Sequence, residues 1–225
     1  MTWSLLDIRG RRKYLTSNER AGFIRAAYDT PTPAGTFCLT LAITGARISE
    51  VLALTRERFD QASGAIVFET LKRRRKGVFR AVPVPVELFL HLDQFHRLTT
   101  TSDDRIWPFS RPTAWKYVKA MMATANTPAI VSQPRALRHA FGVEAVQQRI
   151  ALSLIKKWLG HAKIETTAIY AEPIGEEERE LARLTWSAIV DRPTTGDRSY
   201  ANPTASVASR PNSSTLRNEQ SSVFR

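Results

Sequence analysis

The chain has 225 residues, and 33 lysines and arginines against 21 aspartates and glutamates give it a net charge of +12. Hydrophobic residues make up 43% and charged residues 24%, which is normal for a globular protein and excludes a mainly disordered chain. A positive field of this strength concentrates polyanions around the protein. The charge therefore favours a nucleic acid as the partner, and the alternative is a basic, solvated surface with no such partner.

The single cysteine, Cys38, lies in an apolar run. One cysteine cannot form an internal disulfide, which favours a reducing compartment. Because no acid–base partner is near it in the sequence, we interpret Cys38 as a core thiol and not as a nucleophile. No apolar stretch has the length of a secretory signal or a membrane-spanning helix. We therefore expect a soluble, cytoplasmic protein with no membrane partner.

The pattern of the first 54 residues predicts helices. Thr16 and Glu19 have the spacing of a capping box and begin a helix of about ten residues, which Pro31 and Pro33 end. Further helices are predicted over 37–43 and 47–54, because apolar residues recur there at helical spacing. The break between them contains the sequence Thr-Gly-Ala.

Between residues 59 and 85 the apolar residues alternate as they do in strands. Strands are predicted over 65–69 and 78–84, joined by a strongly basic turn at 72–77. Ser132 is a possible N-cap for the helix that begins near Pro134. The helices expected after the strands cover 86–98, 112–125, 134–149, 152–159 and 175–190. The fold class is therefore mainly α with one small antiparallel β-sheet (α+β).

The composition divides the chain into three parts. Residues 1–15 form a short basic lead-in, and residues 16–190 form the structured domain. Residues 191–225 are rich in serine, threonine, proline, asparagine and arginine. A tail with so few apolar residues cannot offset its conformational entropy by burial, so we expect it to be disordered.

Three segments are candidates for chemistry, namely TGARISE at 44–50, RALRHAF at 135–141 and LGHAKIETTAIY at 159–170. In this order they resemble the motifs of the tyrosine recombinases, the family of phage integrases and chromosome-dimer resolvases. The family has a tyrosine nine residues after the histidine of its Leu-Gly-His motif, as Tyr170 follows His161 here. The resemblance covers residues 14–190 and implies the architecture of the family's catalytic domain.

The resemblance implies a role for each of five residues. Arg47 and Arg138 supply planar guanidinium groups that bind phosphate oxygens. Tyr170 attacks the phosphorus and forms a 3′-phosphotyrosyl ester, which conserves the bond energy for rejoining. His161 donates a hydrogen bond to the scissile phosphate. Lys72, at the end of the first predicted strand, protonates the departing 5′-oxygen.

Two positions leave alternatives. Lys76 lies in the same turn as Lys72 and competes with it for the role of general acid, or the whole turn only contacts phosphates. Arg135 stands where the family has the histidine of His-x-x-Arg. An arginine stays protonated and cannot act as the base for Tyr170, although it can bind the phosphate. We expect the neighbouring His139 to support the core instead of replacing that base.

The resemblance implies double-stranded DNA as partner and a tetramer on DNA. The sequence contains no metal-ligand cluster and no glycine-rich phosphate loop, so we expect neither cofactor nor metal. The predicted helix at 175–190 docks on a neighbouring protomer or packs on its own domain. Because the resemblance begins near Tyr14, no room remains for an N-terminal DNA clamp, as in the short inversion recombinases. The expected function is site-specific recombination for a mobile element. The alternatives are a DNA-binding remnant with little or no activity and relaxation of the type IB topoisomerase kind.

Overall fold

The computed structural model describes residues 4–70, 77–98 and 105–171, and also residues 179, 182, 183, 185 and 186. Lys72, Lys76, most of the predicted helix at 175–190 and the predicted tail at 191–225 lie outside these residues. The chain divides into two units, residues 1–187 and 188–225, and every described residue belongs to the first.

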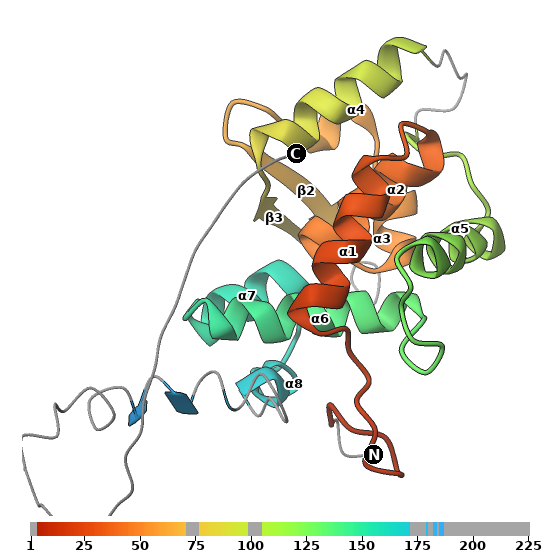
Figure 1. Ribbon diagram of the computed structural model, residues 1–225. Helices are drawn as coiled ribbons and strands as arrows, with labels where there is room; N and C mark the ends of the chain where they lie inside the picture. Colours follow the sequence, from red (N-terminus) through yellow and green to blue (C-terminus); the bar gives the residue numbers. More distant parts are fainter. Residues whose placement is uncertain are drawn as a thin grey trace, which may run out of the picture. The chain divides into compact units, whose positions relative to one another are not determined.

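The described part is mainly helical with a three-stranded antiparallel sheet, which confirms the predicted fold class (Figure 1). The α-helices are α1 (Ser17–Tyr28), α2 (Pro33–Thr44), α3 (Ile48–Leu52), α4 (Val86–Leu98), α5 (Arg111–Thr124), α6 (Pro134–Gln147), α7 (Leu152–Leu159) and α8 (Glu165–Ala168). Two 3₁₀ turns are η1 (Arg56–Arg58) and η2 (Ile169–Ala171). The strands, in sheet order, are β1 (Phe59–Asp60), β2 (Ala65–Glu69) and β3 (Phe79–Pro83).

Helix α2 is the central helix of the core. Its residues from Gly35 to Ala42 are all buried, and it contacts α1, α4, α5 and α6 (Figure 1). The helix carries buried threonines whose hydroxyls form hydrogen bonds. The Thr40 hydroxyl donates to the carbonyl of Thr36 at 2.9 Å. The indole of Trp107 donates to the Thr36 hydroxyl at 3.1 Å. Buried polar groups are tolerated when they are paired in this way.

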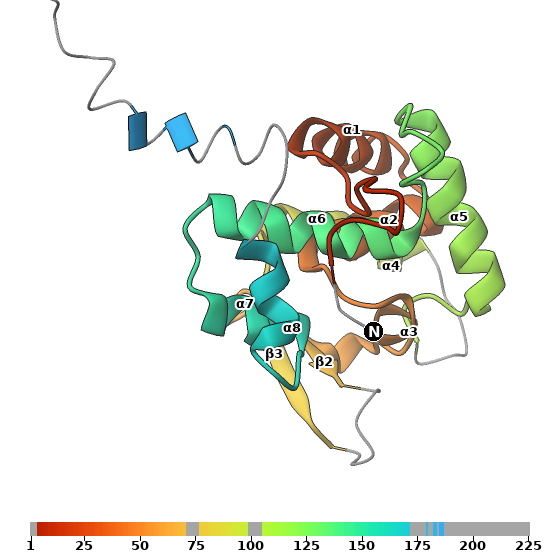
Figure 2. The same ribbon diagram turned by 90° about the horizontal axis from the view of Figure 1, so that it is seen from below.

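The sheet lies beside α3 and α7, which belong to the first and the last of the three motif segments. Its strands β2 and β3 contact α3 and α7 respectively, and Figure 2 shows β3 next to α7. Exposed and buried residues alternate along β3, so Arg80 and Val82 point inward. Val82 joins the hydrophobic core, whereas Arg80 brings a charge into the interior.

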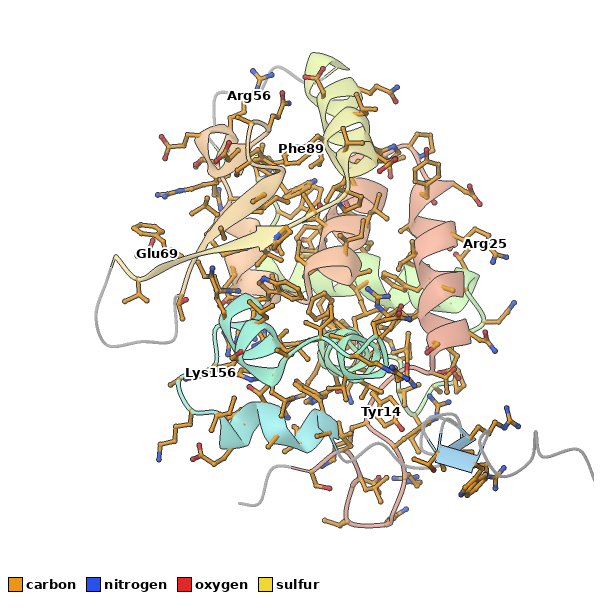
Figure 3. The ribbon with its side chains drawn as sticks, turned by 90° about the vertical axis from the view of Figure 1, so that its left-hand side faces the viewer. Tyr14, Arg25, Arg56, Glu69, Phe89 and Lys156 are labelled. Atoms are coloured by element: carbon orange, nitrogen blue, oxygen red, sulfur yellow. The ribbon has the colours of Figure 1, made fainter. Side chains whose placement is uncertain are left out.

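A second, smaller hydrophobic cluster lies on the other side of α6. It joins Leu5 and Tyr14 of the N-terminal segment to Ile169 and Tyr170 of η2. Figure 3 shows Tyr14 beside α6, and its side chain is almost completely buried. The basic lead-in therefore packs, in part, against the segment that carries the predicted nucleophile.

Four local predictions differ from the structure. The helix expected over 37–43 begins earlier, at Pro33, because proline is well tolerated in the first turn and Thr32 caps it through a 3.2 Å bond from the amide of Gly35. Gln133 occupies the N-cap of α6 instead of Ser132, without a side-chain capping bond. The helix expected over 47–54 is limited to α3. The sheet has a third strand, β1, which is only two residues long and gives little alternation to detect.

Among the described residues, no helix combines the length and the apolar character needed to cross a lipid bilayer.

Candidate active site

The first motif positions Arg47 through a break between α2 and α3. Gly45 ends α2 in the left-handed conformation, with φ of 61°, which glycine adopts without strain. A side chain at this position would also meet the ring of Phe141 at 2.7 Å. Arg47 follows at the N-cap of α3, so its side chain leaves the helix at the edge of a pocket.

Glu50, one turn further along α3, binds Arg47 through its carboxylate. Its carboxylate accepts from the Arg47 guanidinium at 2.7 Å and from the Arg47 amide at 2.9 Å, and it also accepts from Arg80 at 2.7 Å. Burial by itself would raise the pKa of Glu50, but attraction to Arg80 and these hydrogen bonds lower it below its ordinary value. Glu50 is therefore a buried anion between two arginines.

Arg80 connects three segments of the site. In addition to Glu50, its guanidinium donates to the Trp158 carbonyl at 2.7 Å and to the Thr70 hydroxyl at 3.2 Å. It also lies so close to Gly160 that a side chain there would meet it at 3.1 Å. Arg80 thus ties the end of β2, strand β3 and the end of α7 to α3.

Arg138 is buried on α6, and its guanidinium donates hydrogen bonds to backbone carbonyls at the ends of α2 and α7. It donates to the Gly45 carbonyl at 2.9 Å and to the Leu159 carbonyl at 2.5 Å. Burial, followed by repulsion from Arg47, lowers the pKa of Arg138 to about 10, so it remains a cation at neutral pH. A guanidinium has five N–H donors, so these two bonds leave capacity for an anion in the pocket.

His161 follows the left-handed Gly160 that ends α7. Its Nδ1 lies 2.9 Å from the hydroxyl of the buried Thr167, which orients the ring. Burial and repulsion from Arg138 lower the pKa of His161 to about 3, so the imidazole is neutral in the empty site. Thr167 was not among the predicted site residues, although its place in the last motif was a usable signal.

Tyr170 lies in η2 with 1% of its surface exposed. Its ring stacks on that of His161, with 6.1 Å between centroids and an interplanar angle of 19°. Gly142 on α6 makes room for this ring, because a side chain there would meet it at 2.6 Å. Burial raises the pKa of Tyr170 above its ordinary value, against the opposing attraction of Arg138, Arg47 and Arg135, so the hydroxyl keeps its proton.

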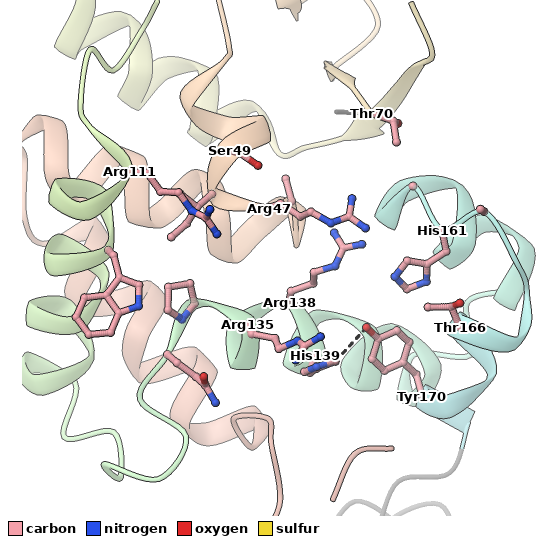
Figure 4. A pocket seen from close by; sticks show the side chains of 17 residues that line it. Arg47, Ser49, Thr70, Arg111, Arg135, Arg138, His139, His161, Thr166 and Tyr170 are labelled. Carbon is pink, nitrogen blue, oxygen red and sulfur yellow. Dashed lines mark hydrogen bonds between the residues drawn. The ribbon is translucent and has the colours of Figure 1, made fainter. Parts of the chain in front are cut away.

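His139 contacts the predicted nucleophile. It is buried, with 4% of its surface exposed, but its Nδ1 lies 3.2 Å from the hydroxyl oxygen of Tyr170. Its burial agrees with the expected place in the core, and the register of α6 also turns its ring toward η2 (Figure 4). Sequence spacing along one helix could not reveal a neighbour 31 residues away.

The motif residues meet in one pocket of about 590 Å³ (Figure 4). Of the predicted site residues, it is lined by Arg47, Arg135, Arg138, His161 and Tyr170, whereas Lys72 lies outside the described residues. Arg111, at the start of α5, lines it as well and was not predicted, since no motif surrounds it. Several guanidinium groups around one small cavity form a site for an anion such as a phosphate.

Within the ranges that the structure describes, no three histidine, cysteine, aspartate or glutamate side chains are grouped so that they could hold a metal ion.

The chain belongs to the phage integrase family, whose pattern matches residues 13–176. This confirms the resemblance to tyrosine recombinases. The tyrosine recombinase XerA of Pyrococcus furiosus is 28% identical over 151 residues, which are 63% of this chain and 51% of that protein. The chain spans about half the length of the curated relatives it matches.

Two solved structures have a similar fold. The crystal structure of XerA recombinase matches with a TM-score of 0.67 and 24% identity, over 80% of this chain and 65% of that one. XerH site-specific recombinase, solved as a pre-cleavage complex bound to its difH substrate, matches with a TM-score of 0.63 and 20% identity, over 80% of this chain and 59% of that one.

Proposed function

We propose that the chain is the catalytic part of a site-specific DNA recombinase, which cuts and rejoins DNA through a 3′-phosphotyrosyl intermediate on Tyr170. The observation that carries this proposal is the meeting of Arg47, Arg138, His161 and Tyr170 around one pocket. These residues come from three separate segments of the chain. A hydroxyl nucleophile surrounded by phosphate-binding donors is what phosphodiester cleavage requires.

The pocket binds the scissile phosphate in this proposal. Arg47 and Arg138 are cations held by bonds to Glu50 and to backbone carbonyls, so they are oriented before the substrate arrives. Such preorganised donors stabilise the negative charge that grows in the transition state, and losing one typically costs about 10²–10³ in rate. His161 is oriented by Thr167 and supplies a further donor to the phosphate.

The cleavage step exchanges one ester bond for another. The Tyr170 hydroxyl gives its proton to a base as its oxygen forms a bond to phosphorus. The bond from phosphorus to the 5′-oxygen breaks, and that oxygen takes a proton from Lys72. Lys76 is the alternative acid. A 5′-hydroxyl of another strand then reverses the same steps, and no ATP is needed because the phosphotyrosyl ester keeps the bond energy.

Double-stranded DNA is the proposed substrate, in agreement with the net charge of +12 and with the arginines of the pocket. We further infer that the protein assembles as a tetramer on DNA through the segment at 175–190, and that it acts in the cytoplasm for a mobile element. The buried, unpaired Cys38 agrees with a reducing compartment.

Covalent trapping tests the proposed nucleophile. DNA from either side of the protein's own gene is made into nicked suicide duplexes, which prevent rejoining and accumulate the adduct. The wild type should form a protein–DNA adduct, and Tyr170→Phe should form none while binding the same DNA within about twofold, because it keeps the ring and loses only the hydroxyl.

Three other outcomes would contradict the proposal. An adduct with Tyr170→Phe would remove Tyr170 from its role. DNA binding by the wild type without any adduct would favour a DNA-binding remnant. Relaxation of supercoiled plasmids without site preference would favour the topoisomerase alternative.

A further inference from the structure

The Tyr170 hydroxyl and the His139 imidazole form a buried pair. The Nδ1 of His139 lies 3.2 Å from the Tyr170 oxygen, and the two ring centroids are 5.8 Å apart. Gly142, on the same side of α6, leaves the space that the tyrosine ring occupies. Both side chains line the pocket that contains Arg138, so the pair is adjacent to the proposed phosphate position (Figure 4).

The groups that face His139 favour its neutral form. Arg135 and Arg138 lie on its own helix, Lys13 approaches from the N-terminal segment, and His161 and Tyr170 come from the last motif. Burial, followed by repulsion from the two arginines and Lys13, lowers the pKa of His139 to about 4. A neutral imidazole with hydrogen on Nε2 has a lone pair on Nδ1 that accepts from the tyrosine hydroxyl.

Resting on the proposed function, we propose that His139 is a catalytic residue that accepts the Tyr170 proton as the nucleophile attacks. The proton moves from the Tyr170 oxygen to His139 Nδ1 while the bond from that oxygen to phosphorus forms. The bond to the 5′-oxygen breaks in the same step, and that oxygen is protonated by the general acid. Rejoining returns the proton from His139 to the tyrosine.

This assignment explains how the chain works with Arg135 in the position where the family has a histidine. Arg135 cannot accept a proton, but His139 lies on the same helix and contacts the reacting oxygen. A phosphate bound near Arg135 and Arg138 would offset their positive charge and so raise the proton affinity of His139. Proton transfer would thereby depend on DNA being in the pocket.

Cleavage by His139→Asn tests the proposal. Asparagine can still accept a hydrogen bond from Tyr170, but it cannot take up the proton. We expect single-turnover cleavage of the suicide duplex to slow by about 10²–10⁴-fold, the usual contribution of a general base. His91→Asn is the matched control, because His91 lies in α4, stacks on Tyr28 and does not line the pocket. That variant should cleave at the wild-type rate.

The dependence of the rate on pH separates proton transfer from packing. The wild type should cleave at a nearly constant rate between about pH 6.5 and 8.5, because His139 is neutral throughout. In His139→Asn the tyrosine proton must go to hydroxide, so its rate should rise about tenfold per pH unit. Wild-type speed and a flat profile in His139→Asn would overturn the proposal.

A rescue experiment and a spectroscopic measurement complete the test. Adding Arg135→His to His139→Asn restores an imidazole at the usual family position. The double variant should cleave at least tenfold faster than His139→Asn alone. Nitrogen-15 NMR of the free wild-type protein should show His139 with hydrogen on Nε2 at pH 7 and protonation near pH 4. Hydrogen on Nδ1 of His139 at pH 7 would overturn the proposed role of His139, and this measurement does not require DNA cleavage. A wild type that forms no adduct would instead contradict the proposed recombinase function.

Discussion

At the scale of single residues, burial and nearby cations act in opposite directions on the proton of Tyr170. Its hydroxyl is surrounded by the cations Arg47, Arg135 and Arg138, which lower its pKa, while its burial raises the pKa by more. The free protein therefore holds Tyr170, the proposed nucleophile, in its neutral form. In the proposed reaction, a bound phosphate and a proton acceptor promote the attack.

The replacement Arg135→His is the sharpest test of the residue that departs from the family pattern. It introduces an imidazole where the family has one, so we expect cleavage at least as fast as in the wild type, measured by single-turnover reaction on the suicide duplex. A loss of about 10²-fold or more would instead show that Arg135 is a required phosphate donor. Adduct formation at saturating DNA separates this effect from weaker binding.

At the scale of secondary-structure elements, the buried pair of Glu50 and Arg80 joins α3, β3 and the end of α7. Both side chains are at most 5% exposed. A buried pair is weak support for stability in itself, but removing one partner leaves the other charge without compensation. The pair therefore holds Arg47 and the Leu-Gly-His segment in one fixed arrangement.

Arg80→Ala should lower the free energy of unfolding by about 3–5 kcal/mol, because Glu50 stays buried without its main partner. Urea unfolding followed by circular dichroism measures the change. Arg58→Ala is the matched control, since Arg58 is a partly exposed arginine over the ring of Phe79 on the same sheet. The control should change stability by less than about 1 kcal/mol, and equal effects of the two variants would contradict this role.

Gly45→Ala tests the break between α2 and α3. Alanine in the left-handed conformation costs about 1–2 kcal/mol, and at this position it also collides with Phe141. Gly10→Ala is the control, because Gly10 has φ of 72° but nothing lies within 4 Å of the added carbon. Urea unfolding should show a larger loss for Gly45→Ala, and cleavage should fall as Arg47 moves. Equal losses of stability would mean that the collision is relieved at no cost.

At the scale of the whole molecule, the buried histidines make stability depend on pH. The pKa of His139 is lowered to about 4 and that of His161 to about 3, both below the ordinary value of 6.5. The unfolded chain therefore binds protons that the folded chain excludes, so stability rises with pH. The contribution of the two neutral histidines to stability is fully present above pH 6.5 and is lost as pH falls toward 4.

Between pH 7 and pH 5 we expect a loss of about 2 kcal/mol per histidine in the free energy of unfolding. Urea titrations at both pH values measure it, and His139→Asn should reduce the loss by about its own share. A wild-type stability that does not change between these pH values would show that the two imidazoles are not held neutral.

The local order of the chain follows from the sequence. Capping by Thr16 and Glu19, the helical periodicity and the alternation around residues 65–69 depend on neighbours along the chain, and the structure contains the elements that they predict. The predicted roles of Arg47, Arg138, His161 and Tyr170 came from the order and spacing of motifs. These residues do meet in one pocket, whereas their roles, and that of Lys72 outside the described residues, stay predictions.

What only the tertiary structure decided are the contacts between segments far apart in the chain. The bonds of Glu50 with Arg80 and of His139 with Tyr170 span 30 and 31 residues. No local pattern encodes such pairs, because they depend on how α3, β3, α6 and η2 pack. The sequence by itself determined that Tyr170 is the candidate nucleophile, and the packing decided that its hydroxyl faces the imidazole of His139.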